Sequence, residues 1–293
     1  MNVSVVIPAF NEIESLPNLV RELEKGLSSY STWEVIFVDD GSSDGSTEWM
    51  TDYCRNNQNF KLVQFYRNYG KAAALSEGFK VASGEYIITM DADLQDDPAE
   101  IVNLISKLEE GWDLVSGWKK TRHDPLNKTL PSKIFNFVTR LMTGVKIHDF
   151  NCGLKGYKQA VVKSIDIYGG RHRYIPALAG QRKFKVTEIV VNHRARQFGE
   201  TKYGGSRMFH GFFDLITILF LNRYTQQPLH LFGTIGIGFL NFGFFVECGV
   251  LYYKYALNEP FSKHMALLMF GIMLIVVGIN FFSIGLLGEL MAR

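Results

Sequence analysis

The sequence predicts an α/β domain built on a mostly parallel sheet, followed by two helices that cross a membrane. Up to about residue 165, short β-rich runs alternate with amphipathic helical stretches, the pattern of a parallel sheet covered by helices. From about Pro228 the composition becomes strongly apolar. With 293 residues and 47% hydrophobic content, the chain can fill one large core or two smaller ones.

Five strands and four helices are expected in the first part of the chain. The runs that predict strands are Val3–Ile7, Glu34–Val38, Lys61–Phe65, Tyr86–Met90 and Leu114–Ser116. The stretches that predict helices are Leu16–Leu27, Ser46–Asn56, Gly70–Ala82 and Pro98–Glu110. Each strand then ends in a polar loop at one edge of the sheet, and this carboxyl edge is where open α/β sheets bind ligands.

Two long apolar runs predict membrane-spanning helices. Leu229–Tyr252 has 24 residues with Glu247 as its only formally charged member, and Met265–Gly288 has 24 residues with none. At about 1.5 Å per residue, each helix would be roughly 36 Å long, enough for a hydrocarbon core of about 30 Å. Two buried helices of a soluble domain are the less favoured alternative, because such helices seldom run this far without a charge.

The N-terminal segment MNVSVVIPAFNE lacks a basic stretch followed by a long apolar one, so no signal peptide is expected. The first domain should therefore lie in the cytosol, with the short connection Tyr253–His264 on the far side of the cytoplasmic (inner) membrane. The aromatic-rich segment Met208–Asn222 predicts a helix in the plane of the interface. The expected organisation is a cytosolic domain (1–207), a juxtamembrane amphipathic helix (208–227) and a multi-pass hairpin (228–293).

Charge and cysteine content narrow the classes of partner. The net charge of +2 gives no indication of a nucleic-acid partner, and three scattered cysteines indicate neither a disulfide framework nor a zinc site. Basic residues dominate between Arg171 and Arg207, which suggests a surface facing phosphate head groups. Glycines and Glu247 in the apolar runs leave a homo-oligomer open.

The stretch MDADLQDDP (Met90–Pro98) places four aspartates within seven positions, directly after a predicted buried strand. Like charges this close repel unless a cation or hydrogen-bond donors hold them. Alternation along an extended chain puts Asp91 and Asp93 on the same side, with Gln95 next in phase. Their oxygens suit Mg²⁺ or Mn²⁺ carrying phosphates, although a solvated acidic turn is the alternative for such a motif alone.

Two further polar loops follow predicted strands. In VVIPAFNE (Val5–Glu12) a buried strand breaks at Pro8, and in VDDGSSDGS (Val38–Ser46) two acids stand at the strand end, followed by glycines that allow tight turns. A turn followed by a helix N-cap would explain the second motif without a ligand. Because both loops share an edge with the acidic stretch, a common pocket is favoured.

These motifs, together with RNYGKAAALSEGF (Arg67–Phe79), resemble the family 2 glycosyltransferases with a GT-A fold in their order and spacing. With the two apolar runs, the whole chain resembles the branch that uses polyprenyl phosphates, relatives of dolichyl-phosphate mannose synthase and of bacterial undecaprenyl-phosphate glucosyltransferases. The resemblance implies a Rossmann-like, mostly parallel sheet domain followed by interfacial and transmembrane helices.

The resemblance also implies a nucleotide-sugar donor site with a divalent cation. The residues expected to contact the donor are Pro8, Ala9, Asn11, Glu12, Asp39, Asp40, Lys71, Asp91, Ala92, Arg194, Arg196, Lys202 and Tyr203. Asp39 would lie near the base, and the last four belong to a basic loop that would close over the diphosphate, unless it is a plain membrane-surface patch. Asp91, Asp93 and Gln95 would hold Mg²⁺ or Mn²⁺, which stabilises charge on the leaving nucleoside diphosphate.

A lipid phosphate is already largely ionised near pH 7, so the acceptor site needs positioning cations more than a strong base. The candidates follow the fifth predicted strand: Lys119, Lys120, Arg122 and Lys133. An exposed basic loop is the alternative. In HDFNCGLKGYK (His148–Lys158) the resemblance makes Asp149 a candidate base or orienting carboxylate, although an aspartate here would also cap a turn. Catalytic roles are thus expected for Asp149, Asp93 and Arg122.

The expected activity is inverting transfer of one hexose, glucose from UDP-glucose, to undecaprenyl phosphate at the cytosolic face. A GDP-mannose-using polyprenyl-phosphate mannose synthase is the alternative. A processive polysaccharide synthase is less favoured, because no QxxRW motif is present and two spans make a poor channel. A non-catalytic membrane adaptor is less favoured, because it would have no use for mutually repelling carboxylates. A dinucleotide-dependent oxidoreductase is also less favoured, because no GxGxxG motif follows the first predicted strand.

Overall fold

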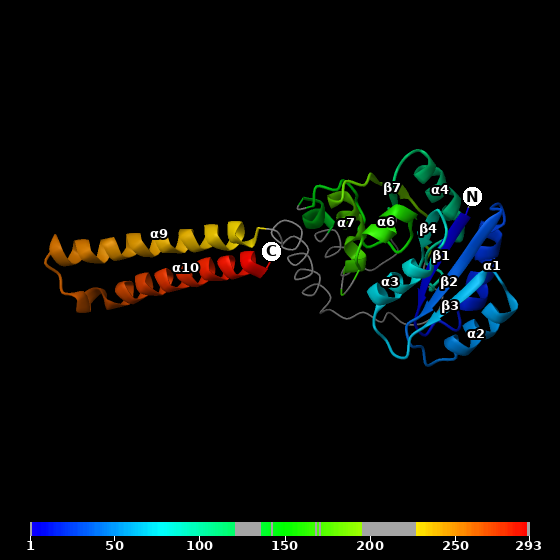
Figure 1. The fold of residues 1–293 in the computed structure, drawn as a ribbon, viewed down its shortest axis with the longest axis horizontal. Helices are drawn as coiled ribbons and strands as arrows, with labels where there is room; N and C mark the ends of the chain where they lie inside the picture. The colour runs from blue at the N-terminus through cyan, green and yellow to red at the C-terminus, as the bar shows by residue number, and fades with distance from the viewer. Residues whose placement is uncertain are drawn as a thin grey trace. The chain divides into compact units, whose positions relative to one another are not determined.

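The protein is described by a computed structural model that covers residues 2–120, 136–141, 143–167, 169, 171–194 and 227–291. The chain divides into two compact units, Met1–Leu215 and Ile216–Arg293 (Figure 1). The boundary predicted after residue 207 and nearly all of the predicted juxtamembrane helix fall outside the described residues, so both stay predictions.

The first unit is built on one seven-stranded sheet with the strand order β3-β2-β1-β4-β6-β5-β7. The strands are β1 (Asn2–Ala9), β2 (Thr32–Asp39), β3 (Phe60–Gln64), β4 (Tyr86–Thr89), β5 (Leu114–Trp118), β6 (Lys155–Lys158) and β7 (Val186–Val190). The strands β1 to β4 pair in parallel, β6 lies antiparallel between β4 and β5, and β7 pairs in parallel with β5. The prediction of a mostly parallel α/β sheet is confirmed.

The helices of this unit follow the strands in alternation. Those with both ends in the described part of the chain are α1 (Leu16–Leu27), α2 (Ser46–Asn56), α3 (Lys71–Val81), η1 (Pro98–Glu100), α4 (Ile101–Glu109), α6 (Gln159–Ser164), η2 (Arg171–Tyr174) and α7 (Ile175–Gln181). All five predicted strands and all four predicted helices are present, with ends shifted by a few residues. The sequence did not predict β6, which is only four residues long with a lysine at each end, or β7, which has no fully buried residue.

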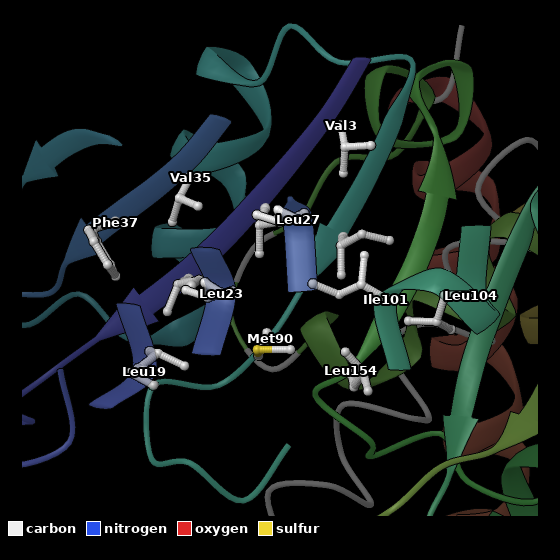
Figure 2. Close-up of a cluster of buried hydrophobic side chains, with 14 of the residues drawn as sticks. Val3, Leu19, Leu23, Leu27, Val35, Phe37, Met90, Ile101, Leu104 and Leu154 are labelled. Atoms are coloured by element: carbon white, nitrogen blue, oxygen red, sulfur yellow. The ribbon is translucent and has the colours of Figure 1, made fainter. Parts of the chain in front are cut away.

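The core lies between the sheet and the apolar faces of α1 and α4 (Figure 2). Leu19, Leu23 and Leu27 recur at helical spacing and are fully buried against the sheet. Because strand side chains alternate between faces, Val5 points to this core, whereas Val6 points to the opposite face. There α3 packs so closely that any side chain at Gly78 would collide with Val6.

At the amino edge of the sheet, a buried carboxylate is surrounded by donors. Glu34 is 7% exposed. Its Oε1 accepts from Ser4 Oγ at 2.5 Å and from both the backbone N and the Oγ of Ser83 at 2.8 Å, while its Oε2 pairs with Lys61 Nζ at 2.7 Å. Burial opposes ionisation, but these partners hold the pKa of Glu34 at about 2.

The second unit contains two long apolar helices, α9 (Pro228–Tyr255) and α10 (Met265–Met291), joined through η3 (Phe261–His264). Both are long and apolar enough to cross a membrane. They pack through glycines: a Cβ at Gly236 would lie 2.7 Å from Gly278 O, and a Cβ at Gly278 would lie 2.8 Å from Gly236 O. Small residues at these positions let the two backbones approach, as is common between helices in membranes.

Candidate active site

The loops after β1 and β2 meet at the carboxyl edge and are tied together by reciprocal hydrogen bonds. Asn11 N donates to Ser42 Oγ at 2.9 Å, and Ser43 N donates to Asn11 Oδ1 at 2.8 Å. Glu12 N donates to Ser46 Oγ at 3.0 Å. Asn11 has a φ of 54°, the left-handed conformation that Asn tolerates better than most residues. The motifs VVIPAFNE and VDDGSSDGS therefore form one rigid wall.

Asp39 stands at the end of β2, paired in register with Ala9 of β1. Its side chain is fully buried. Oδ1 accepts from Ser42 N at 3.0 Å, and Oδ2 accepts from Thr47 Oγ1. The carboxylate thus fixes the shape of the loop that follows it. A contact of Asp39 with the nucleotide base stays a prediction.

Asp40 connects this wall to the start of α3. Its carboxylate accepts from Tyr69 N at 2.7 Å and from Gly70 N at 2.9 Å. Gly70 has a φ of 91°, a conformation that favours glycine, and it directly precedes Lys71 at the first position of the helix. Burial raises the pKa of Asp40, and the nearby charge of Asp39 adds to this effect. Asp40 therefore positions Lys71.

The Lys71 ammonium pairs with Asp91 Oδ1, which joins the RNYGK motif to the acidic stretch after β4. Burial favours the neutral acid, but the charges of Lys71, Lys119 and Lys155 hold the pKa of Asp91 at about 2. On its other side Asp91 lies against Gly153, where a Cβ would be 2.5 Å from Asp91 Oδ2. The absence of a side chain at Gly153 lets the loop approach the carboxylate.

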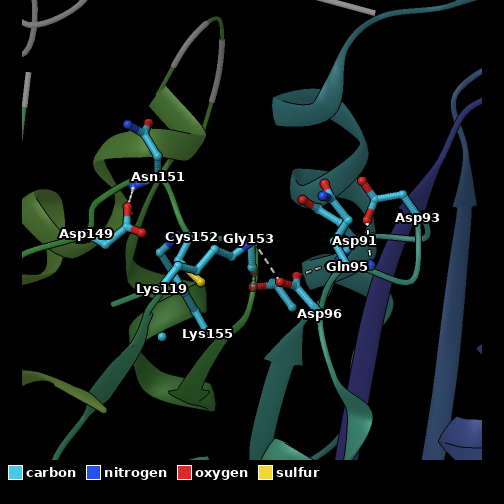
Figure 3. Close-up of polar contacts among 12 residues, drawn as sticks. Asp91, Asp93, Gln95, Asp96, Lys119, Asp149, Asn151, Cys152, Gly153 and Lys155 are labelled. Carbon is cyan, nitrogen blue, oxygen red and sulfur yellow. Dashed lines mark hydrogen bonds and ion pairs between the residues drawn. The ribbon is translucent and has the colours of Figure 1, made fainter. Parts of the chain in front are cut away.

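The remaining aspartates of MDADLQDDP each accept from a donor, and Figure 3 shows two of them, Asp93 and Asp96. Asp93 Oδ1 accepts from Gln95 N at 3.2 Å, and Asp96 pairs with Lys119 Nζ at 3.0 Å. Burial disfavours the charge on Lys119, but Asp96 outweighs it and the pKa of Lys119 is raised. Asp97 Oδ1 accepts from Ala99 N at 3.0 Å. Lysine side chains and backbone amides therefore offset much of the electrostatic repulsion among the four aspartates.

Lys119 was a predicted acceptor-phosphate cation, and the structure gives it an internal partner instead of an exposed position: its side chain is 13% exposed. Lys120 is exposed, with Nζ 5.8 Å from the centre of the Trp118 ring. Arg194 pairs with Glu22 and Asp97. The predicted site residues outside the described part of the chain are Arg122, Lys133, Arg196, Lys202 and Tyr203.

The loop before β6 carries Asp149, which is 1% exposed. Its Oδ1 accepts from Asn151 N at 3.0 Å, and its backbone carbonyl accepts from Ser116 Oγ at 3.2 Å (Figure 3). The first contact is the turn cap that the alternative to a catalytic role expected. A role as base or orienting carboxylate stays a prediction.

Sequence reasoning missed Lys155, the first residue of β6. It is 4% exposed, lies in register with Thr89 of β4 and Ser116 of β5, and donates from Nζ to the Cys152 carbonyl. Burial lowers its pKa, and the charge of Lys71 acts in the same direction. The sequence feature that could have indicated this residue is a lysine between Leu154 and the pair Gly156 and Tyr157, because a lysine with apolar neighbours is seldom buried unless it has a partner.

The residues present fit a divalent cation such as Mg²⁺ or Mn²⁺. Asp91 and Asp93 offer carboxylate oxygens and Gln95 an amide oxygen, and Mg²⁺ is commonly bound by one or two carboxylates together with substrate phosphates. The ammonium of Lys71 on Asp91 shows that this carboxylate accepts a positive charge. Among the described residues no three His, Cys, Asp or Glu side chains converge on one point, so phosphate oxygens would complete the coordination.

Solved structures share the fold of the first unit. Glucosyl-3-phosphoglycerate synthase from Mycobacterium tuberculosis in complex with UDP superposes with a TM-score of 0.59 at 19% identity, covering 75% of this chain and 79% of that chain. The same enzyme with Mn²⁺ and UDP-glucose gives a TM-score of 0.58 at 18% identity, with 75% and 78% covered. Identities this low establish the GT-A fold alone.

Two curated relatives match over the whole chain. The dodecaprenyl-phosphate galacturonate synthase of Rhizobium johnstonii is 36% identical over 299 residues, covering 100% of this chain and 88% of the relative. The undecaprenyl-phosphate 4-deoxy-4-formamido-L-arabinose transferase of Salmonella choleraesuis is 36% identical over 293 residues, covering 99% and 88%. The sequence profile of glycosyl transferase family 2 matches residues 4–166, which contain the β1, β2 and β4 loops. The chain therefore belongs to glycosyltransferase family 2.

Proposed function

We propose that this glycosyltransferase moves one sugar from a nucleoside diphosphate donor to the phosphate of a polyprenyl lipid. The observation that carries the proposal is the match at 36% identity to two polyprenyl-phosphate sugar transferases over 99–100% of the chain, the apolar hairpin included. The α9–α10 hairpin supports it further, because a lipid acceptor has to be met at a membrane.

The donor diphosphate is proposed to lie at the carboxyl edge, between the Asn11 loop and the acidic stretch. Lys71 is the cation proposed to contact it, since its ammonium lies at this edge on Asp91. A divalent cation bound by Asp91, Asp93 and Gln95 would stabilise the charge that develops on the leaving diphosphate. UDP is the proposed nucleotide, on the support of UDP-bound neighbours with the same fold.

Transfer is proposed to be a single displacement with inversion at the sugar carbon. The lipid phosphate oxygen attacks, the bond from that carbon to the diphosphate breaks, and its electron pair leaves with the nucleoside diphosphate. A largely ionised phosphate needs no general base to remove a proton. We therefore propose that Asp149, which caps a turn by accepting from Asn151 N, orients groups in the site and does not act as a base. Lys120, Arg122 and Lys133 stay the proposed acceptor cations, with Lys119 held by Asp96.

The identity of the sugar is the finest part of the proposal. Glucose from UDP-glucose was the expectation, with mannose from GDP-mannose as the alternative. The curated relatives are named for galacturonate and 4-deoxy-4-formamido-L-arabinose, so they lend no support to glucose. We therefore propose a UDP-linked sugar and rank galacturonate and the formamido pentose ahead of glucose.

The proposed location is the cytoplasmic membrane, with α9 and α10 as spans and the catalytic unit on the cytosolic side. The support is the length and composition of both helices. A cysteine-accessibility experiment on intact cells tests the orientation: a cysteine at Asn258, in the connection between the helices, should react with an impermeant reagent, and one at Asp52 should not.

The activity is tested with the full chain in detergent or vesicles containing undecaprenyl phosphate. UDP-galacturonate, UDP-4-deoxy-4-formamido-L-arabinose, UDP-glucose and GDP-mannose are supplied one at a time, with Mg²⁺, Mn²⁺ or a chelator. Mass spectrometry of the lipid fraction should show one sugar added from one donor, with loss of the product in chelator. A product ladder would indicate a polymerase, and donor binding without any glycolipid would indicate an adaptor; either result overturns the proposal.

A further inference from the structure

The four residues that follow β7, Val191–Arg194, form a strap across the acidic stretch. Arg194 N donates to Gln95 O at 2.9 Å, and His193 forms an isolated antiparallel bridge with Asp96. Asn192 N donates to Glu100 Oε1 at 3.1 Å. The strap thus contacts both the middle of the acidic stretch and the helix start that follows it.

The Arg194 side chain extends this attachment to a third element. Its Nη1 pairs with Glu22 of α1 at 2.6 Å and its Nη2 with Asp97 Oδ2 at 2.9 Å. Asn192 Nδ2 also donates to Asp97 Oδ2 at 3.2 Å. Burial opposes ionisation of Asp97, but the Ala99 backbone amide, Asn192 and Arg194 together lower its pKa. Two pairs at separate guanidinium nitrogens fix the direction of the side chain.

Between the two candidate cation ligands Asp93 and Gln95, the backbone adopts a costly conformation. Leu94 has a φ of 60°. Residues other than glycine, asparagine and aspartate seldom adopt this left-handed conformation, because their Cβ then lies too close to the backbone. Leu94 is 2% exposed, so the core holds its side chain, and the strap holds the backbone of the next residue, Gln95. Such a conformation persists only where its surroundings determine it from several directions.

We propose that Arg194 is a positioning residue: through Glu22 and Asp97, the strap holds the acidic stretch so that Leu94 keeps its left-handed conformation and Asp93 and Gln95 face the site. This deepens the proposed function, on which its catalytic consequence rests. It differs from the sequence prediction, in which the Arg194 guanidinium would contact the donor diphosphate. In the structure both guanidinium nitrogens that make ion pairs face structural carboxylates.

A double-mutant cycle between Glu22 and Arg194 separates the two roles. Glu22→Gln removes a partner on α1, a helix that contributes no predicted site residue, and Arg194→Lys keeps the charge but cannot span two carboxylates. Glu24→Gln is the matched control, because Glu24 lies on the same helix, is exposed and accepts a hydrogen bond from Tyr53 OH, away from the strap. The full chain is used throughout.

The readouts are the transfer rate, UDP binding and amide hydrogen exchange of residues 92–98. We expect both single variants to speed exchange in this segment and to lower kcat/KM by about tenfold, and the double variant to be no worse than Arg194→Lys. Glu24→Gln should change none of these. UDP binding without metal should stay within about twofold in all variants.

Two outcomes would overturn the proposal. If Arg194→Lys weakens UDP binding while Glu22→Gln leaves exchange and rate unchanged, Arg194 contacts the donor instead. If neither variant speeds exchange of residues 92–98, the strap does not hold the acidic stretch. A chain that transfers no sugar would refute the proposed function. Hydrogen exchange and UDP binding need no turnover, so the exchange rates would still show whether the strap holds the acidic stretch.

Discussion

The two edges of the sheet hold their carboxylates with different kinds of partner. At the amino edge, Glu34 is one acid surrounded by three donor groups from two serines and by a lysine, so its hydrogen-bonding capacity is filled mainly by neutral groups. At the carboxyl edge, Asp91 and Asp96 each rely mainly on a lysine, and the backbone at Leu94 is strained. We expect the first arrangement to contribute to the stability of the fold and the second to contribute to ligand binding.

The largest expected effect is at the carboxyl edge. Asp93→Ala should lower the transfer rate by about 10³-fold, the scale for losing one group that stabilises developing charge. The melting temperature should stay the same or rise, because one repelling carboxylate is gone. Asp52→Ala, on an exposed face of α2, is the control for removing a negative charge. Normal turnover by the Asp93 variant would remove this residue from the site.

At the amino edge we expect a loss of stability with little change in activity. Glu34→Ala should lower the free energy of unfolding by about 3 kcal/mol, because Ser4 and Ser83 lose their buried acceptor. Activity per folded molecule should change by less than about twofold. Chemical denaturation and single-turnover assays check both statements, and Glu77→Ala, an exposed helix pair with Lys80, should cost no more than about 0.5 kcal/mol. A large loss of activity without loss of stability would contradict the comparison.

A smaller effect concerns pH. The folded-state pKa of Glu34 is held at about 2, below the value of about 4.3 in an unfolded chain. Its ionisation therefore contributes stability above pH 4.3, and this contribution is lost as the pH falls toward 2. In Glu34→Gln the free energy of unfolding should decline less steeply between about pH 4.5 and 2.5. Parallel curves for the two proteins would show that Glu34 does not titrate in this way.

The smallest expected effect is Lys61→Met. The lysine side chain is 48% exposed, so water screens its pair with Glu34, and the cost should be at most about 1 kcal/mol. The double variant Glu34→Gln with Lys61→Met, measured by the same denaturation curves, gives the coupling of the pair. A coupling above about 2 kcal/mol would mean that the lysine, not the serines, stabilises the acid.

The meeting of the polar loops at the carboxyl edge was predictable because each of these loops is continuous in sequence and follows a strand. The polar loops after β1, β2 and β4 had to meet once the sheet was parallel, and MDADLQDDP already signalled its need for positive charge. The identity of the cations was not predictable. Lys71, Lys119 and Arg194 are pairing partners from three separate parts of the chain, and their side chains were all expected to face ligands.

The rest of the site could not be predicted because its contacts are distant in sequence. Arg194 and Glu22 are separated by 172 positions. A four-residue strand such as β6 is too short for its hydrophobic pattern to predict it. Nothing in the residues KGYK indicates that the strand pairs antiparallel with its neighbours. The buried Lys155 and the close approach at Gly153 both depend on that strand, so they were missed together.

The strand order determines when each strand can pair during synthesis of the chain. Among the described strands, β5 pairs with β6 and β7, and both follow it in the chain. During synthesis β1 to β4 can assemble as soon as residue 89 has emerged, but β5 must wait without a partner until β6 is made, about 40 residues later. The half of the sheet that carries the acidic loop can therefore form early, whereas β6 with Lys155 is added later and β7 after it.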